Sequence, residues 1–384
     1  MLNRHELAKQ IFQLTSKLFP DVKNQNDLAQ KNWDKICNDD LFAQKVEAAK
    51  TSFLVPRWQG DLGDVFDVPN DLQSYSVLAV DGSQIYPDRN FSGARCFLLN
   101  LGGCFIRYGK KDDGLSSKVE FFSEPKVFLP QDLIDDDKVP FGVDLVDLKR
   151  EELELKKLFE RASGSVDVCF VDGTLIFWNL ENKQQEVKDY FLNSYLSCLN
   201  DFYKNGILIA GYISFPKSRE LVNLIRLGLC NLTVANCNAC NNQYQDADCK
   251  LVGNLVDANV ARFYLEPNQR TTIFYSSSKI TQHYPDQLKP CFFYLHAGEE
   301  IVRIEIPFWI AQNTDYLDLI CKVAIDQCKK GQGYPVVLAE AHEQAVVKGL
   351  DRSFFYHLIQ KIGIEQKRRF FVSKKSLKKR GMGI

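Results

Sequence analysis

Two hydrophobic runs in the chain end in the same polar signature. The run Ser-Val-Leu-Ala-Val at 76–80 meets Asp-Gly-Ser, and the run Val-Cys-Phe-Val at 168–171 meets Asp-Gly-Thr. Short continuous apolar runs of this kind predict buried strands, and an Asp-Gly pair behind them predicts a turn. Asp81 and Asp172 therefore each stand at the carboxyl end of a predicted buried strand.

A fold that brings these two aspartates together has to compensate their charge. Two carboxylates about 4 Å apart repel by roughly 4 kcal/mol at an effective dielectric near 20. A shared proton or a cation removes that repulsion, and a divalent metal is the usual solution. Each Asp-Gly taken alone is equally typical of a simple tight turn. The repetition of the device is what favours chemistry at Asp81 and Asp172.

The first 72 residues have a different pattern from the rest. Residues 1–52 have helical periodicity, with Leu7, Ile11, Leu14 and Leu18 on one face. A second helix is predicted over 26–50, and 56–72 is rich in Gly, Asp and Pro. We therefore predict a helical N-terminal extension and linker over 1–72 and one main domain over 73–384.

The main domain is predicted to be α/β. Its further strands are expected at 95–101, 118–122, 207–213, 291–295, 300–306 and within 333–343, the last with a helix start behind it, and its helices at 144–161, 181–203, 217–227 and 317–329. The first two of these strands are expected to be antiparallel neighbours of the strand at 76–80. Helices alternate with strands from 144 to 213, which indicates a crossover unit with a parallel pair.

Composition changes this picture in few respects. The chain has 384 residues, 45% hydrophobic and 25% charged, with a net charge of −1 that by itself predicts no polyanionic partner. No apolar run approaches the roughly 18 residues of a membrane span. The N-terminus lacks the apolar region of a signal peptide, so a cytoplasmic protein is expected. Most of the twelve cysteines stand singly in apolar patterns, where they act as small buried hydrophobes.

The basic charge is concentrated at the C-terminal end. Residues 361–384 hold nine Lys and Arg and one acid, a net +8, so the remainder carries −9. Aromatic residues are mixed with these cations, a composition that can follow a phosphate backbone and stack on unpaired bases. The alternative is a solvated end with its phenylalanines in the core. The predicted DNA contacts in this tail are Lys374, Lys375, Lys378 and Lys379.

The polar segment 231–254 is rich in Cys and Asn and reads as an insertion. Cys230, Cys237, Cys240 and Cys249 are clustered there, and the middle two have the two-residue spacing of a zinc knuckle. The outer spacings are irregular and a second C-x-x-C is missing. Free thiols in a polar loop are therefore favoured over a metal site.

The order of motifs resembles the NurA nuclease family over roughly residues 75–380. The motifs that carry this resemblance are Asp81-Gly82-Ser83, an acidic helix before Asp172-Gly173-Thr174, Arg303-Ile304-Glu305-Ile306-Pro307, and Tyr334-Pro335 leading to Ala341-His342-Glu343.

The resemblance implies an RNase H-like mixed sheet flanked by helices that cuts DNA with Mn²⁺ or Mg²⁺. It implies 5′-to-3′ exonuclease activity and endonuclease activity on single strands. It further implies a homodimer that docks on a HerA-like hexameric DNA-translocating ATPase. The chain has no G-x-x-x-x-G-K-[ST] loop, so ATP-driven movement is expected to come from that partner.

Carried onto this chain, the resemblance makes Asp81 and Asp172 metal ligands. The family's helix glutamate corresponds to Glu151, Glu152 or Glu154, and we favour Glu154 because it follows an arginine by four residues and precedes a leucine. As a single residue, Glu154 is equally well explained as a solvated helix charge.

His342 and Tyr334 complete the implied site. His342 is expected to bind a second metal or orient the attacking water, Tyr334 to bond a phosphate oxygen, and Lys217 to contact phosphate. Considered alone, His342 fits a helix cap and Tyr334 a turn aromatic. Arg303 and Glu305 alternate on one predicted strand and fit a structural ion pair.

Two other classes compete with a nuclease. A catalytically silent DNA-binding or scaffold subunit of the same translocase complex would keep the fold, although it has no need to retain two aspartates, a helix glutamate and His342 together. An Argonaute-type enzyme would share the fold class, but the chain has nothing like its guide-binding domains. The sequence favours the nuclease.

Overall fold

The computed structural model describes residues 2–18, 23–87, 91–92, 96–109, 117–133, 142–162, 166–240, 248–367 and 371–372. Its strands are β1 (Arg57–Trp58), β2 (Val65–Asp67), β3 (Tyr75–Ile85), β4 (Phe91–Ser92), β5 (Phe97–Tyr108), β6 (Lys118–Phe128), β7 (Val168–Asp172), β8 (Leu208–Ile213), β9 (Gln269–Thr271), β10 (Phe274–Tyr275), β11 (Pro290–His296), β12 (Ile301–Pro307) and β13 (Phe371–Val372).

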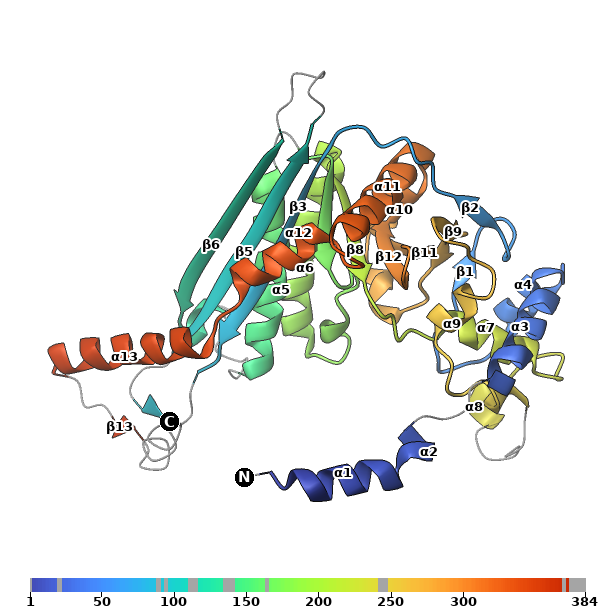
Figure 1. Ribbon diagram of the computed structural model, residues 1–384, viewed down its shortest axis with the longest axis horizontal. Coiled ribbons are helices and arrows are strands. Elements are labelled where there is room, and N and C mark those ends of the chain that lie inside the picture. Colours follow the sequence, from blue (N-terminus) through green and yellow to red (C-terminus); the bar gives the residue numbers. More distant parts are fainter. Residues whose placement is uncertain are drawn as a thin grey trace.

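Helices connect and cover these strands (Figure 1). They are α1 (Arg4–Gln13), α2 (Thr15–Leu18), α3 (Lys23–Cys37), α4 (Phe42–Ala48), α5 (Val143–Ala162), α6 (Gln185–Asn205), α7 (Glu220–Gly228), α8 (Cys237–Cys240), α9 (Asp257–Ala261), α10 (Phe308–Ala311), α11 (Thr314–Lys330), α12 (Val336–Ala345) and α13 (Gly349–Glu365). Short 3₁₀ turns are η2 (Pro130–Asp132), η3 (Trp178–Leu180), η4 (Asp248–Lys250), η5 (Lys279–His283) and η6 (Asp286–Leu288).

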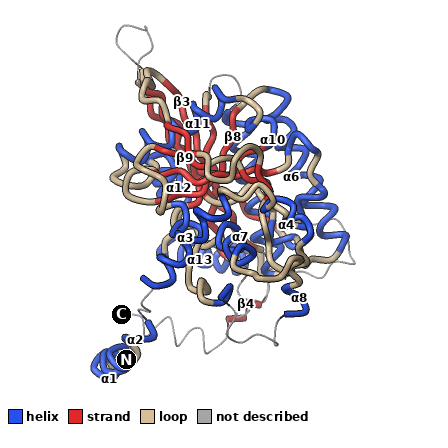
Figure 2. Tube along the Cα trace, turned by 90° about the vertical axis from the view of Figure 1, so that its right-hand side faces the viewer, coloured by secondary structure: helices blue, strands red, loops and turns tan. Residues whose placement is uncertain are grey.

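One mixed sheet forms the centre of the described structure. Its strand order is β1-β10-β11-β12-β8-β7-β3-β5-β6, with β9 joined to β11 and β2 to β9. In the side view the strands run through the middle, with α6 and α12 on opposite sides of them (Figure 2). The predicted α/β class with a central mixed sheet flanked by helices is therefore confirmed.

The first three long strands form an antiparallel meander. β3 pairs with β5 along its whole length, with Asp81 opposite Gly102, and β6 pairs with β5. The prediction for 95–101 is thus confirmed. The turn predicted at Asp81-Gly82 was wrong, because the strand continues through both residues to Ile85. The strand predicted at 118–122 exists as β6, but its placement beside the first strand was wrong. β6 pairs with β5 and not with β3, so it lies at the end of the sheet order.

The two Asp-Gly strands lie side by side. β7 runs parallel to β3, with Val77, Leu78 and Ala79 opposite Val168, Cys169 and Phe170. β8 runs parallel to β7. α5 precedes β7 and α6 connects β7 to β8, as the crossover argument requires. These paired residues are fully buried, which explains their continuous apolar sequence.

The strand predicted within 333–343 was wrong. The segment from Gly331 to Pro335 is a turn, and a helix, α12, follows directly. A four-residue apolar run cannot by itself distinguish a strand from a buried helix turn. This segment forms a helix and not a strand because its apolar residues then pack on β3 and β5, which buries Leu338 and Ala341.

The described part of the N-terminal segment contains four helices. The helix predicted over 26–50 is interrupted, because α3 ends at Cys37 and α4 begins at Phe42. α3 packs against α7, where Trp33 and Ile36 join a second hydrophobic cluster with Leu224. α1 buries none of its residues and lies apart from the sheet (Figure 1). No helix in the described ranges is long and apolar enough to cross a membrane.

All twelve cysteines are free thiols. Cys169, Cys198 and Cys291 are buried as predicted, whereas Cys96 is half-buried. Part of the predicted insertion, 241–247, lies outside the described residues. The predicted tail contacts Lys374, Lys375, Lys378 and Lys379 also lie outside them.

Candidate functional site

Three of the predicted acids line one pocket of about 250 Å³. Asp81 comes from β3 and Asp172 from the end of the adjacent parallel strand β7. The third, Glu154, comes from α5, which packs on β3. Carboxyl ends of parallel strands are where α/β sheets place their ligands. The pairing of β3 with β7 thus brings together side chains that are 91 residues apart.

Glu154 is held by an arginine one helical turn earlier. Arg150 Nη1 lies 2.7 Å from Glu154 Oε1 and also donates to the carbonyl of Gly82 at 3.3 Å. A Cβ on Gly82 would stand 2.4 Å from Glu154 Oε1, so only glycine allows this approach. Burial raises the pKa of Glu154 to about 8, Arg150 acts against that shift, and the negative charge of Asp81 adds to it.

The two neighbouring glutamates differ in their surroundings. Glu151 lines the same pocket and accepts a hydrogen bond from Asn179. Glu152 is 2% exposed and instead pairs with Lys149 and Lys156. Glu152 is therefore committed elsewhere, and Glu154, beside Gly82 and Asp81, is the better placed candidate.

His342 lies beside Asp81, with 2.7 Å between its Nδ1 and Oδ2 of the carboxylate. Its helix, α12, is fixed to the sheet at its last turn: the Ala345 carbonyl accepts hydrogen bonds from Asn100 at 2.8 Å and from Ser83. A Cβ on Gly102 would be 2.1 Å from Ala345 N, so the helix backbone rests directly on β5. The His342 ring is 58% exposed and stays open to solvent.

Tyr334 lies beside Asp172. Burial raises the pKa of Asp172, the Tyr334 hydroxyl hydrogen bond acts against that shift, and Asp81 adds to it. Burial and the Asp172 charge also raise the pKa of Tyr334, so it stays a donor. The Tyr334 ring packs edge-on against Tyr212, with 5.7 Å between ring centroids.

The turn that carries Asp172 is anchored to a distant strand. Gly173 has φ +125°, a conformation that favours glycine. Glu305 on β12 accepts hydrogen bonds from the Thr174 hydroxyl at 2.6 Å and from the Leu175 N–H at 2.9 Å. The predicted pairing of Arg303 with Glu305 exists, at 2.9 Å. The anchoring role was missed, because no local pattern links residues 131 positions apart.

The carboxylate oxygens of Asp81, Asp172 and Glu154 at this pocket are donor types that Mn²⁺ and Mg²⁺ use. His342 does not line the pocket, but its imidazole nitrogen lies beside Asp81 and is a donor type that suits Mn²⁺. Asp81 raises the pKa of the other two acids by repulsion, so the pocket carries negative charge that a cation would offset. Within the described ranges, no three His, Cys, Asp or Glu side chains are arranged so that they could hold a metal ion. These residues therefore supply suitable donor types, but among the described residues they form no preformed metal site.

Among the described residues, Cys230, Cys237, Cys240 and Cys249 form no group that could hold a metal ion. Burial raises the pKa of Cys237 and Cys249, and Arg226 acts against that shift in both.

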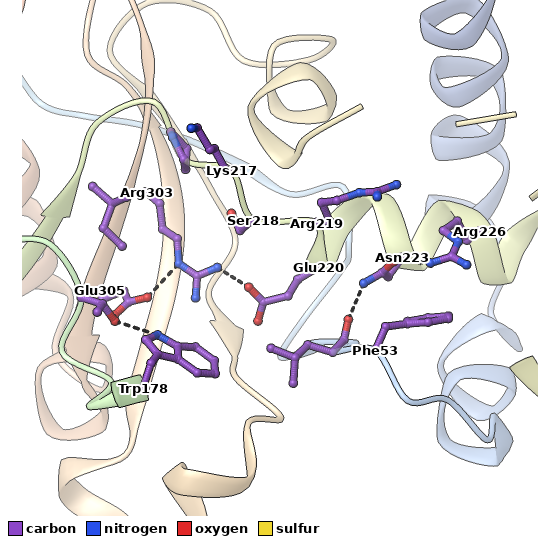
Figure 3. A pocket seen from close by; sticks show the side chains of 14 residues that line it. Phe53, Trp178, Lys217, Ser218, Arg219, Glu220, Asn223, Arg226, Arg303 and Glu305 are labelled. Atoms are coloured by element: carbon purple, nitrogen blue, oxygen red, sulfur yellow. Dashed lines mark hydrogen bonds and ion pairs between the residues drawn. The ribbon is translucent and has the colours of Figure 1, made fainter. Parts of the chain in front are cut away.

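Lys217 does not line the acidic pocket. It lines a second pocket of about 520 Å³, shown in Figure 3, which shares Thr174 and Trp178 with the first. Two residues earlier on the same loop, Phe215 has φ +45° and is 81% exposed. A bulky residue in this left-handed conformation is an outlier that the sequence did not signal.

The chain matches the family model described as NurA domain over residues 75–347. The match begins at the first residue of β3 and ends two residues after α12. All five predicted catalytic residues fall within it, whereas the N-terminal helices and the basic tail lie outside it. No curated protein matches the chain.

Proposed function

The chain belongs to the NurA family, and from that premise we propose that it is a metal-dependent nuclease that hydrolyses DNA phosphodiester bonds. The observation that carries the proposal is the meeting of Asp81 from β3, Glu154 from α5 and Asp172 from the end of β7 in one pocket. If the two Asp-Gly pairs had only a structural role, the close approach of the Glu154 carboxylate to Gly82 would have no purpose.

The proposed cofactor is Mn²⁺ or Mg²⁺, held by Asp81, Glu154 and Asp172, with His342 as a further ligand that favours Mn²⁺. When bound, such cations activate a water and stabilise the leaving oxygen in an in-line displacement.

The protein's own groups prepare this site. Arg150 holds Glu154 and offsets part of its charge, so that the carboxylate can lie near Asp81. Tyr334 donates a hydrogen bond to Asp172 and fixes its orientation. His342 Nδ1 lies 2.7 Å from Asp81 Oδ2, so the imidazole is placed to orient the Asp81 carboxylate.

The sheet supports a more specific fold proposal. A three-stranded antiparallel meander, β3-β5-β6, continues into two parallel strands, β7 and β8, each preceded by a helix. We propose that this is an RNase H-like core, with the acids at the usual edge of its central strands.

DNA is the proposed substrate, cut as a 5′-to-3′ exonuclease and as an endonuclease on single strands. Lys217 and the tail residues Lys374, Lys375, Lys378 and Lys379 are proposed phosphate contacts. Phe215 adds a proposed stacking surface, because strained and exposed side chains beside a site are often functional.

The proposed assembly is a homodimer on a HerA-like hexameric ATPase, in DNA-end processing or in defence against foreign DNA. Its support is family membership together with the lack of a nucleotide-triphosphate loop in the chain. The extension and the tail, which lie outside the matched domain, would then be free to contribute contacts specific to this protein.

A second candidate is a catalytically silent scaffold subunit of the same complex. It is favoured by one observation: within the described residues no three metal-binding side chains are already arranged to hold an ion. Digestion of 5′- and 3′-end-labelled DNA with Mn²⁺, Mg²⁺ or EDTA, with and without the ATPase, separates the two. Metal-dependent products that shorten from the 5′ end support the nuclease, whereas intact DNA under all conditions supports the scaffold.

A further inference from the structure

The pocket of about 520 Å³ that contains Lys217 combines features that a nuclease active site does not need. Its size is within the roughly 300–1,000 Å³ of small-molecule sites. Cations lie along one side, Lys217 and Arg219 from the β8–α7 loop, and aromatic rings of Trp178 and Phe53 lie along the other, with Glu220 between them (Figure 3).

Three of the four cations that line this pocket have no acidic partner among the described residues, although Arg226 donates a hydrogen bond to the Asn223 side chain. Within the described residues, no acid forms an ion pair with Lys217, Arg219 or Arg226. Arg226 instead lies over the Phe53 ring, 4.2 Å from its centroid. Arg303 is the exception, because its guanidinium is held by Glu305 and Glu220 at the back of the pocket. The front of the pocket is therefore positively charged.

Two buried polar atoms lack partners there. The Oε1 of Glu220, a residue that is 4% exposed, accepts no hydrogen bond in the described structure, and Arg219 Nε donates none. A buried polar atom left unsatisfied costs about 1–3 kcal/mol, which a ligand that hydrogen-bonds to it would recover. The Oε1 of Glu220 is therefore available to accept a hydrogen bond from a polar group of a ligand at the bottom of the pocket.

The front wall comes from residues that lie outside the matched domain. Phe53 and the neighbouring Leu54 precede the matched NurA domain, and the Leu54 carbonyl accepts a 2.8 Å hydrogen bond from Asn223 of α7. The N-terminal segment is therefore attached to the domain at this point. On the other side, Thr174 and Trp178 form a wall shared with the acidic pocket.

We propose that this cavity is a nucleotide pocket, which takes the phosphate on Lys217 and Arg219, the base between Trp178 and Phe53, and a polar edge of the base on Glu220. The proposal deepens the proposed nuclease function and rests on it, since it places one nucleotide of the DNA strand, or a released mononucleotide, next to the Asp172 turn. An aromatic wall, free cations and a buried hydrogen-bonding group together fit a nucleotide better than an inorganic anion.

The test is calorimetric titration of the full chain with dAMP in EDTA, which keeps metal-bridged phosphate out of the acidic pocket. We expect dAMP to bind roughly 5- to 150-fold more tightly than deoxyribose 5-phosphate, because base stacking contributes about 1–3 kcal/mol. Phe53→Ala should lose most of that difference, and Lys217→Gln should weaken both ligands and reduce the salt dependence.

Matched controls separate the pocket from general effects. Phe66→Ala removes a phenylalanine that also lies under an arginine, Arg270, at 4.3 Å, but outside the pocket. It should leave dAMP binding unchanged. Phe53→Leu keeps apolar packing without an aromatic face and should weaken dAMP binding if the wall stacks on the base. Unchanged binding in both Phe53 variants, at unchanged melting temperature, would overturn the proposal.

The source of the nucleotide is decided by a 5′-phosphorylated trinucleotide titrated into Asp172→Asn. Binding that depends on Phe53 supports the pocket as a seat for a DNA end. If the trinucleotide binds independently of Phe53 while dAMP binding still depends on Phe53, the pocket is a site for free mononucleotide. If the protein cleaves DNA but shows no Phe53-dependent binding, the nucleotide pocket is refuted and the proposed nuclease function stands. If it shows Phe53-dependent binding but cleaves no DNA, only the proposed nuclease function is refuted.

Discussion

Gly102→Ala is expected to damage the site through α12, whose last turn rests on β5 at Gly102. The added Cβ would lie 2.1 Å from Ala345 N and 2.3 Å from the Gln344 carbonyl carbon. Both are backbone atoms, so no side-chain rotation relieves the clash. Ordinary contact needs about 3.5 Å, which means that the end of α12 has to move by more than about 1 Å.

That movement reaches His342 directly. The residue lies one turn before Ala345 on the same helix, and its ring is 2.7 Å from Asp81. A displacement of about 1 Å in a catalytic constellation typically costs on the order of 10²-fold in rate. Overpacking should also lower the free energy of unfolding by about 1–3 kcal/mol.

The assay is DNA cleavage at saturating Mn²⁺, with thermal unfolding measured on the same preparations. Gly349→Ala is the matched control, because nothing lies within 4 Å of its added Cβ. We expect the control to cleave like the wild type. If folded Gly102→Ala cleaved DNA as fast as Gly349→Ala, the placement of His342 by α12 would not matter for catalysis, and our reasoning about this helix would fail.

Three further outcomes are expected. Phe215→Gly should unfold at an equal or higher temperature, since it relieves a left-handed backbone at an exposed residue, yet bind single-stranded DNA several-fold more weakly; unchanged affinity would contradict the stacking role. Thr174→Val should leave Glu305 without one hydrogen bond and slow cleavage about tenfold with DNA affinity intact, whereas Thr174→Ser should restore the rate. Iodoacetamide should modify the partly exposed Cys240 well before Cys169, because burial raises the pKa of the Cys169 thiol. Added EDTA should not change this order of modification.

The sequence predicted those parts of the fold that local patterns determine. The apolar runs before Asp81 and Asp172 had to be strands buried on both faces, and the helix–strand alternation around them fixed a parallel arrangement. The run at 336–339 was misjudged because four apolar residues fit either a strand or a helix turn. The packing of this segment on β3 and β5, which includes the close approach at Gly102, decides for the helix, and such packing is tertiary.

The site was predictable to a similar extent. Asp81, Glu154 and Asp172 line one pocket as expected from their elements. Lys217 lines the neighbouring pocket and not the acidic one, because nothing in the sequence specifies the direction of the β8–α7 loop. The anchoring of the Asp172 turn by Glu305 was likewise out of reach, since such contacts exist only after the sheet has formed.

The central claim is that the carboxylates of β3 and β7 form the metal-dependent cutting site. The most direct measurement is digestion of end-labelled single- and double-stranded DNA with Mn²⁺, Mg²⁺ or EDTA by the wild type, Asp81→Asn and Asp172→Asn, each with and without the ATPase. We expect cleavage by the wild type with either metal, none with EDTA, and losses of at least about 10²-fold in both variants. Wild-type cleavage that survives in either variant, or in EDTA, would contradict the claim.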